Sequence, residues 1–350
     1  MLIAVTVDAN RQIFPLALAI VNKETKEAWS WFLSCLRIHM VVGRRGVTYI
    51  SDRAPTILRS FNDLVELHQP NAYHRFCLRH VKSNFLSNFP NKQLEGLMWQ
   101  AAIQHQECKF KAVMQCLKDA EPGAYNFLMK ILLEKWTVHR DGDKRWGILT
   151  TSLSESFNGF LKKSRGLPIT TIIKLTYGQI LKRFVSRKQY AQELINEKEL
   201  WPPVVVKKIL KYELKSKNHQ VTTYNGETGV FEVETYLRQG HDGRKHIIKF
   251  SRNTCECQKW QAYHMPCSHV LKVTEQINKV AHDLVSEYYS MVKYFETYRV
   301  PFQPLGDESN WPKAPFKMIC NETFIRKKGS RKTTRAPNEM DIGRTRYSKS

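Results

Sequence analysis

Long hydrophobic runs are missing from this 350-residue sequence. The longest run, from Ile13 to Val21, has nine residues and contains Pro15, whereas a membrane-spanning helix needs roughly 20 apolar residues. The first residues, MLIAVTVDAN, lack a basic stretch, a long apolar segment and a small-residue cleavage site. We therefore expect neither a membrane span nor a secretory signal.

Cysteine is also scarce, with 8 residues in the whole chain. So few cysteines do not make a disulfide-stabilised scaffold, and a reducing compartment is the expectation. Closely spaced Cys and His residues are then interpreted first as metal ligands. Four of the cysteines stand alone, at Cys35, Cys108, Cys116 and Cys320.

Acidic residues are outnumbered, with 32 Asp and Glu against 55 Lys and Arg, which gives a formal net charge of +23. Disordered chains combine a high net charge with low hydrophobicity. Here the hydrophobic content of 42% and the aromatic content of 11% are typical of a globular chain. Such a balance argues against acidic small-molecule chemistry as the main function. It indicates a polyanionic partner, and nucleic acid is the commonest one.

The positive charge is concentrated in two segments. Residues 160–220 hold 14 Lys and Arg against 4 Glu, and residues 326–350 hold 9 basic residues against 2 acidic ones. Each segment could be a solvated surface, but two of them in so basic a chain favour contact with phosphates. The candidate nucleic-acid-binding residues are Lys162, Lys163, Arg165, Lys182, Arg183, Arg187 and Lys188.

The first part of the chain has an α/β pattern. Alternating apolar residues predict a β-hairpin over 2–22 that turns at Asp8-Ala9-Asn10. A short strand ending in a carboxylate is expected at 47–52, and helices with apolar stripes are expected on either side of it. The Pro202-Pro203 pair predicts a domain boundary.

The most specific local pattern is TCECQKWQAYHMPCSHVLKV, which contains Cys255-x-Cys257, nine further residues and then Cys267-x-His269. Side chains two apart on a strand point to the same face, so both thiolates of the first pair can reach one ion. Three Cys and one His make a closed tetrahedral set for a structural Zn²⁺. His264 is a less favoured substitute ligand, and the alternative to a metal site is four unrelated buried residues.

This CxC…CxH pattern, with its Pro-Cys-Ser-His run and the strand pair expected before it, resembles the SWIM zinc finger. Most of residues 1–190 resembles the Mutator-like (MULE) transposases, which are RNase H-like enzymes that often carry a SWIM finger after the catalytic domain. The segments that carry this resemblance, in order, are AVTVDANRQIFPLALAIVNKET, WSWF, YISDR, HRFCLRHVKSNF and TTSLSESFNGFLKKSRGLPIT.

By this resemblance, Asp52 matches the second catalytic acid of the family and Glu155, in SESFN, matches the third. The implied chemistry is two-metal phosphoryl transfer with Mg²⁺ held by carboxylates. Cys77-x-x-His80 matches a further family motif. Taken without the family, this pair could equally be half of another metal site or a local structural feature.

The resemblance also implies a first catalytic Asp on a strand upstream of the residue that matches Leu2. We expect that strand to be missing, so that the chain is a truncated or degenerate copy with Asp52 and Glu155 as vestiges. Asp8 is a poor substitute, because it belongs to the hairpin turn. Mg²⁺ is then expected only if the acidic site is active.

The expected architecture is α/β plus α. It comprises an incomplete RNase H-like domain over 1–200 with a helical insertion at about 88–145, a linker over 201–225, a zinc-binding α+β SWIM unit over 226–300, and a basic, mostly disordered tail over 301–350. The leading hypothesis for the function is a nuclear, transposase-derived protein that binds DNA without cleaving it. The alternatives are an active DDE-type transposase whose first acid lies outside this sequence, and a non-enzymatic regulatory protein whose zinc finger contacts other proteins.

Overall fold

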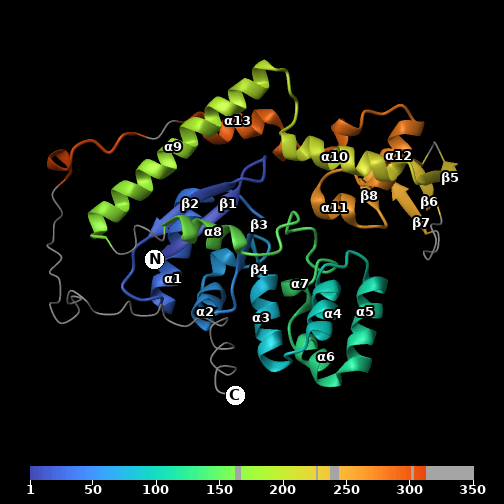
Figure 1. The fold of residues 1–350 in the computed structure, drawn as a ribbon, viewed down its shortest axis with the longest axis horizontal. Helices are drawn as coiled ribbons and strands as arrows, with labels where there is room; N and C mark the ends of the chain where they lie inside the picture. The colour runs from blue at the N-terminus through green and yellow to red at the C-terminus, as the bar shows by residue number, and fades with distance from the viewer. Residues whose placement is uncertain (162–166, 226–227, 237–243, 301–302, 313–350) are drawn as a thin grey trace.

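The computed structural model describes residues 1–161, 167–225, 228–236, 244–300 and 303–312. It is a mixed α/β structure (Figure 1). Two small strand pairs with α1, α2 and α8 lie in the centre, helices α3–α7 lie below and to the right of them, and α9 and α13 lie above. A second α/β unit, which contains β5–β8, lies to the right. None of the helices in the described ranges combines the length and the hydropathy of a membrane-spanning segment.

Four strands form two separate pairs in the first part of the chain. Strands β1 (Leu2–Val7) and β2 (Ile13–Ala19) are antiparallel, as the alternation of apolar residues predicts. Strands β3 (Val47–Ser51) and β4 (Ala72–Phe76) are parallel. No hydrogen-bonded ladder joins the two pairs within the described part of the chain.

Two helices hold these pairs together through side chains. Helix α1 (Lys26–Cys35) is capped by the Thr25 hydroxyl and continues into a π-helical turn, η1 (Leu36–Met40). Helix α2 (Pro55–Asp63) begins with Pro55, where a missing N–H costs nothing. Their apolar faces share one buried cluster with residues from β1, β2 and β4.

The segment from residue 78 to residue 136 is helical. Its helices are α3 (Leu78–Asn88), α4 (Lys92–Ala102), α5 (Glu107–Ala120), α6 (Pro122–Met129) and α7 (Leu133–Trp136). Met98, Leu117, Leu128 and Trp136 are fully buried among them. Because burial of apolar surface is the main favourable term in folding, these helices form a core of their own.

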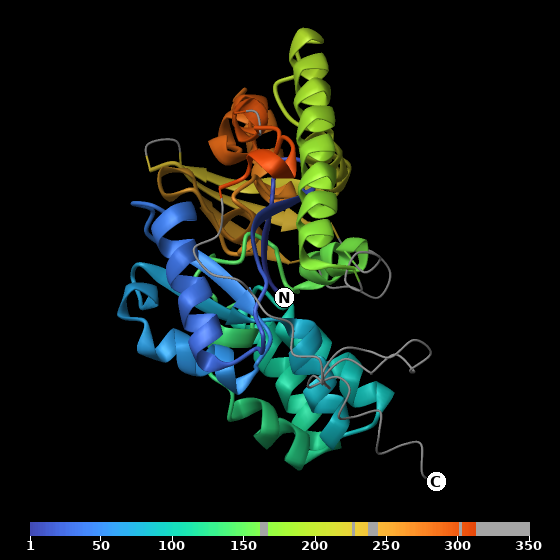
Figure 2. The same cartoon turned by 90° about the vertical axis from the view of Figure 1, so that its left-hand side faces the viewer.

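The outer face of the hairpin is covered by α8 (Ser152–Leu161), the long α9 (Ile169–Asn196) and α13 (Met291–Arg299). Figure 2 shows α9 as one continuous helix along the edge of the molecule. Helix α13 returns from the second unit to pack along α9, and it buries Tyr294 and Tyr298 against the hairpin. The zinc unit was predicted to cover residues 226–300. The structure differs at the end of this range, because α13 packs against the hairpin and α9.

The predicted linker over 201–225 also differs from the structure. Helix α10 (Pro203–Ser216) and strand β5 (His219–Asn225) occupy it. The antiparallel sheet β5-β6-β7-β8 continues with β6 (Val230–Thr235), β7 (Lys245–Lys249) and β8 (Thr254–Cys255), and α11 (Lys259–Tyr263) and α12 (Ser268–Gln276) follow it. The remaining short helical turns are η2 (Val65–Leu67), η3 (Phe250–Arg252), η4 (Ala281–Leu284), η5 (Glu287–Tyr289) and η6 (Glu308–Asn310).

The hairpin turn carries a buried polar network. The Tyr298 hydroxyl donates to Asp8 Oδ2 at 2.6 Å, and Arg187 Nη1 donates to the same hydroxyl at 2.8 Å and to the Ile13 carbonyl at 2.6 Å. Burial raises the pKa of Asp8, although the hydrogen bonds from Tyr298 and the Gln12 amide and the charge of Arg187 act against it. The network joins the hairpin to α9 and α13.

We predict that Tyr298→Phe lowers the free energy of unfolding by about 1–3 kcal/mol, because it leaves a buried carboxylate oxygen without its donor. Chemical denaturation at pH 7 measures the change. Tyr288→Phe is the matched control, since Tyr288 is 63% exposed. An equal loss in both variants would show that the network contributes nothing specific.

A second prediction concerns pH. Burial, with the charges of Lys135, Arg75 and Arg145, lowers the pKa of His74 to about 3, so the folded protein keeps this imidazole neutral while the unfolded chain protonates it near pH 6.5. Stability contributed by neutral His74 is therefore lost as the pH falls below 6.5. We expect His74→Gln to gain about 2 kcal/mol relative to the wild type between pH 7 and pH 5. Denaturation across this range tests it, with the exposed His39 replaced likewise as control.

Candidate metal centre and acidic site

Three thiols and one imidazole converge between β8 and α12. The ligand atoms of Cys255, Cys257, Cys267 and His269 all lie within 4.8 Å of one another. His269 Nδ1 lies 3.7 Å from Cys255 Sγ and 3.8 Å from Cys267 Sγ, so Nδ1 is the nitrogen that faces the thiols. All four residues are at least nine-tenths buried. The structure thus brings the four predicted zinc ligands together.

Local backbone structure explains how these residues meet. Cys255 lies opposite Ile248 in the β7–β8 ladder, and its backbone is held by the Gln261 side chain, which accepts from Cys255 N at 3.2 Å and donates to Cys255 O at 3.1 Å. Gln258 takes a left-handed conformation, which turns the chain after Cys257 into α11. Cys267 precedes the first turn of α12, where His269 follows.

The chemistry of this donor set fits Zn²⁺. Burial raises the pKa of Cys267 to about 12, and hydrogen bonds shared with the other two thiols raise that of Cys255. Three thiols in so small a buried space cannot all ionise without a cation. A divalent ion removes that conflict, because it binds thiolates directly. Two further imidazole rings pack beside this ligand, since the ring centres of His219 and His246 each lie 4.4 Å from that of His269.

His264, the substitute ligand considered from the sequence, is engaged elsewhere. Its ring stacks on Trp146 at 3.6 Å, and its Nε2 lies 3.1 Å from the Asp143 carbonyl oxygen. It belongs to a junction between the zinc unit and the loop that follows α7. Gly147 in that loop has φ +75°, and a Cβ there would lie 2.6 Å from the Tyr263 ring.

The predicted acidic residues both affect the pKa of one histidine. Asp52 directly follows β3, where its Oδ1 accepts from the Ala54 amide at 3.1 Å. Glu155 lies on α8, and His80 lies in the first turn of α3. Burial favours the neutral imidazole, but Cys77 and the carboxylates of Asp52 and Glu155 outweigh it and raise the pKa of His80. Two acids more than 100 residues apart therefore act on the same side chain.

Cys77 is completely buried beside His80. Both the amide and the hydroxyl of Thr151 donate to its sulfur at 3.2 Å. Burial alone would raise the pKa of this thiol, but these hydrogen bonds and His80 lower it to about 7. The pair is thus part of the acidic site. Within the described residues it belongs to no group of three metal-ligating side chains.

Glu155 is paired with a cation of the protein itself, because its Oε2 accepts from the Arg79 guanidinium. In the part of the chain that the structure describes, the Cys3His set is the one group of three or more possible metal ligands. Nothing in the local sequence marks Arg79 as this partner, since the two residues lie 76 positions apart.

The candidate nucleic-acid-binding residues divide into three groups. Lys162, Lys163 and Arg165 lie outside the described residues. Lys182 is exposed on α9, and Lys188 is half-buried with Nζ 3.2 Å from the Arg299 carbonyl oxygen. Arg183 is half-buried, and Arg187 belongs to the network at Asp8 and Tyr298.

We predict that the purified chain holds about one Zn²⁺ and that Cys257→Ser loses it together with the order of the zinc unit, because structural zinc sites contribute folding free energy. Metal content by mass spectrometry and thermal unfolding measure both. The control is Cys116→Ser, at an exposed cysteine of α5. Full metal content in Cys257→Ser would refute the ligand set.

Comparisons with known proteins agree with the order of these two sites along the chain. The family model of the MULE transposase domain matches residues 1–84, which include Asp52, Cys77 and His80, and the model of the SWIM zinc finger matches residues 236–278. No curated protein and no solved structure matches the chain. The family resemblance is confirmed: the chain carries a MULE transposase domain followed by a SWIM zinc finger.

Proposed function

We propose that this is a transposase-derived, zinc-containing protein that binds DNA through phosphate contacts and does not cleave it. The observation that carries the proposal is exposed positive charge on α10. The exposed lysines of this helix, at positions 207, 211 and 215, include none within 4.0 Å of a carboxylate in the described structure. Unpaired surface cations attract polyanions, and release of counterions from DNA makes such contacts favourable.

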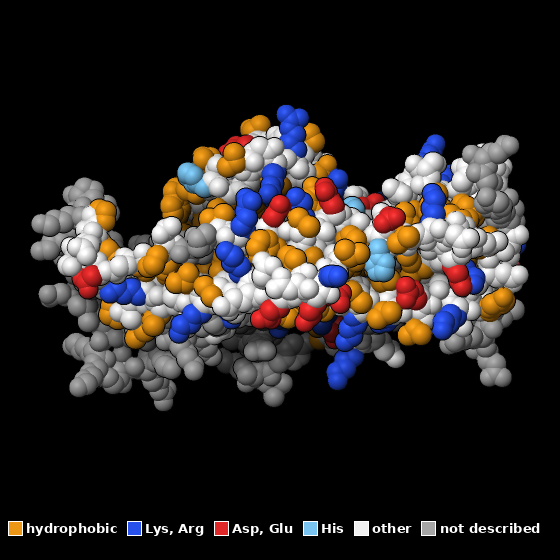
Figure 3. Space-filling view, turned by 90° about the horizontal axis from the view of Figure 1, so that it is seen from above, with side chains coloured by type: hydrophobic (Ala, Val, Ile, Leu, Met, Phe, Trp, Pro, Cys, Tyr) orange, Lys and Arg blue, Asp and Glu red, His pale blue; other side chains and the backbone are white. Residues whose placement is uncertain are grey.

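The surface above α9 supports the same interpretation. Figure 3 shows this face, where Lys and Arg side chains are scattered over α9 among hydrophobic ones, and acidic side chains gather nearer the middle. Lys182 is the exposed candidate here. Arg187 supports the fold, so α9 offers fewer phosphate ligands than its sequence indicates.

We base the proposed absence of cleavage on the number and the pairing of the carboxylates at the acidic site. Two-metal catalysis needs several carboxylates that converge on the ions. Of the two predicted acids, Glu155 is neutralised by Arg79, and the described residues bring no third ligand to the pair. We also propose that the two strand pairs correspond to parts of an RNase H-like sheet and that the protein is nuclear.

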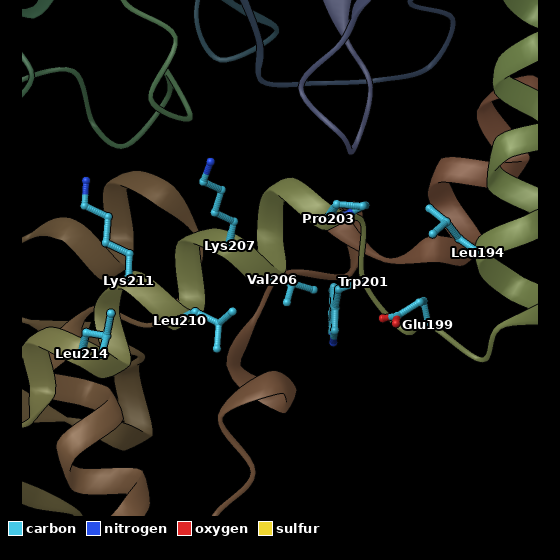
Figure 4. A pocket seen from close by; sticks show the side chains of 9 residues that line it. All are labelled: Leu194, Glu199, Trp201, Pro203, Val206, Lys207, Leu210, Lys211 and Leu214. Atoms are coloured by element: carbon cyan, nitrogen blue, oxygen red, sulfur yellow. The ribbon is translucent and has the colours of Figure 1, made fainter.

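A second candidate, a regulatory protein that binds other proteins, is favoured by one feature. An apolar groove of about 500 Å³ runs along α10 and is lined by Trp201, Val206, Leu210 and Leu214 (Figure 4). Leu210 and Leu214 are 53% and 65% exposed. Exposed leucines one turn apart are typical of surfaces that bind a helix.

The proposal predicts that the full chain binds a 20-base-pair duplex with a steep salt dependence. The slope of log affinity against log salt is about −0.9 for each phosphate contacted. We expect Lys182→Gln to lose about one phosphate contact, which reduces the magnitude of this slope by about 0.9. Fluorescence anisotropy measures the affinities. Lys130→Gln is the control, since this exposed lysine follows α6 at the opposite end of the molecule (Figure 1). A flat salt dependence of the wild type would refute DNA binding.

Cleavage is tested separately with supercoiled plasmid and Mg²⁺ or Mn²⁺. We expect no nicking by the wild type, and unchanged DNA affinity in Asp52→Asn. Nicking that Asp52→Asn abolishes would instead establish the active transposase.

A further inference from the structure

Five cations from three separate parts of the chain lie around the junction of the helical segment, α10 and the zinc unit. We call them the junction cluster: Lys109 on α5, Lys211 and Lys215 on α10, Arg244 before β7, and Lys259 on α11. Lys109 is half-buried and the other four are exposed. Lys109, Arg244 and Lys259 lie outside both basic segments of the sequence.

Direct contacts hold these elements together. The Gln106 side chain donates to the Glu256 carbonyl oxygen at 3.0 Å, between two zinc ligands. Lys109 follows Gln106 by three residues and Lys259 follows Glu256 by three. On the other side, Lys208 Nζ lies 3.6 Å from the centre of the Tyr263 ring. Lys211 and Lys215 follow Lys208 at i+3 and i+7, so they continue the same helix face.

The nearby carboxylates have other partners. Glu107 pairs with Lys111 and Arg140 at 3.1 Å, and Glu256 accepts from the Ile247 amide at 2.9 Å. In the described ranges, no member of the junction cluster lies within 4.0 Å of a carboxylate.

The cations act on one another. Burial, followed by the charges of Arg244 and Lys259, lowers the pKa of Lys109. Burial, followed by the charges of Lys259 and Lys211, lowers that of Lys215. An anion bound across the cluster relieves this repulsion.

We propose that the junction cluster is a binding site for consecutive phosphates of duplex DNA, shared by the helical segment, α10 and the zinc unit. The inference rests on the proposed function and identifies the surface that binds the DNA. The ligand is a backbone rather than a single phosphate because the cations come from separate elements and four of them are exposed, whereas a site for one phosphate encloses it. Repeated phosphates match cations spread over a surface.

The test compares two double variants with the same change of charge. Lys109→Gln/Lys259→Gln removes two members of the junction cluster. Lys118→Gln/Lys279→Gln removes one exposed lysine from α5 and one after α12, neither of which is among the main charges that act on Lys109 or Lys215. Affinity for a 20-base-pair duplex is measured by anisotropy from low to high salt, on full-length protein with its zinc content verified.

We expect the cluster variant to lose about two phosphates from the salt slope, which is about 1.8, and the control variant to keep the slope of the wild type. Equal slopes in the two variants would overturn the inference while leaving DNA binding itself established. A wild type without salt-dependent binding would overturn the proposed function instead. If the cluster variant loses binding of polyglutamate but keeps its DNA slope, the site belongs to an acidic protein and the DNA assignment is wrong.

Discussion

The arrangement of the molecule depends on the polar contacts of one β-hairpin turn. Asp8 accepts from Tyr298 of α13 and lies 3.9 Å from Arg187 of α9. Three residues later, Arg11 donates to the Trp146 carbonyl oxygen at 2.6 Å and to the Tyr289 hydroxyl at 3.1 Å. Between them, Asn10 Oδ1 accepts from the first turn of α10 at 3.3 Å. One short turn therefore orients the long helix, the loop after α7 and the approach to the zinc unit.

These contacts matter because the two strand pairs share no ladder hydrogen bonds among the described residues. A two-stranded sheet is marginally stable alone in water. Here side chains hold both pairs. The α1–α2 cluster contacts both of them, and the α9–α13 cluster covers the other face of the β1–β2 hairpin. Buried polar contacts such as the one at Asp8 add geometric specificity to that packing, since an unsatisfied carboxylate would be costly.

Local chemistry made much of this structure predictable. The hairpin followed from alternation, and the zinc ligands from spacing that needs no knowledge of the fold. The linker prediction failed for a physical reason. Pro203 was interpreted as a boundary, but a proline fits the first turn of a helix as well, and α10 starts there. A helix boundary and a domain boundary carry the same local signal.

The distribution of Lys and Arg along the sequence was the poorest guide to where these residues lie in the structure. A basic residue counts toward the net charge whether it is buried or exposed. Arg75 and Arg145 are almost fully buried and donate to backbone carbonyls in the first part of the chain. Arg187 was expected at a phosphate, yet its guanidinium serves the fold. Conversely, Lys109 lies in a segment with no notable excess of charge, and only the tertiary contact between Gln106 and Glu256 brings it near Lys259.

The positions of Lys259 and Arg244 suggest how the zinc site would contribute to the proposed function. Lys259 follows Cys257 by two residues, and Arg244 precedes the strand that pairs with β8. A closed Cys3His site fixes the backbone on both sides of its ligands, because each bond to the ion limits the conformations of the residues beside it. In the proposed function, a bound ion would therefore support DNA binding without touching a phosphate. It would order the loop that carries Lys259 beside α5 and so hold mutually repelling cations close together.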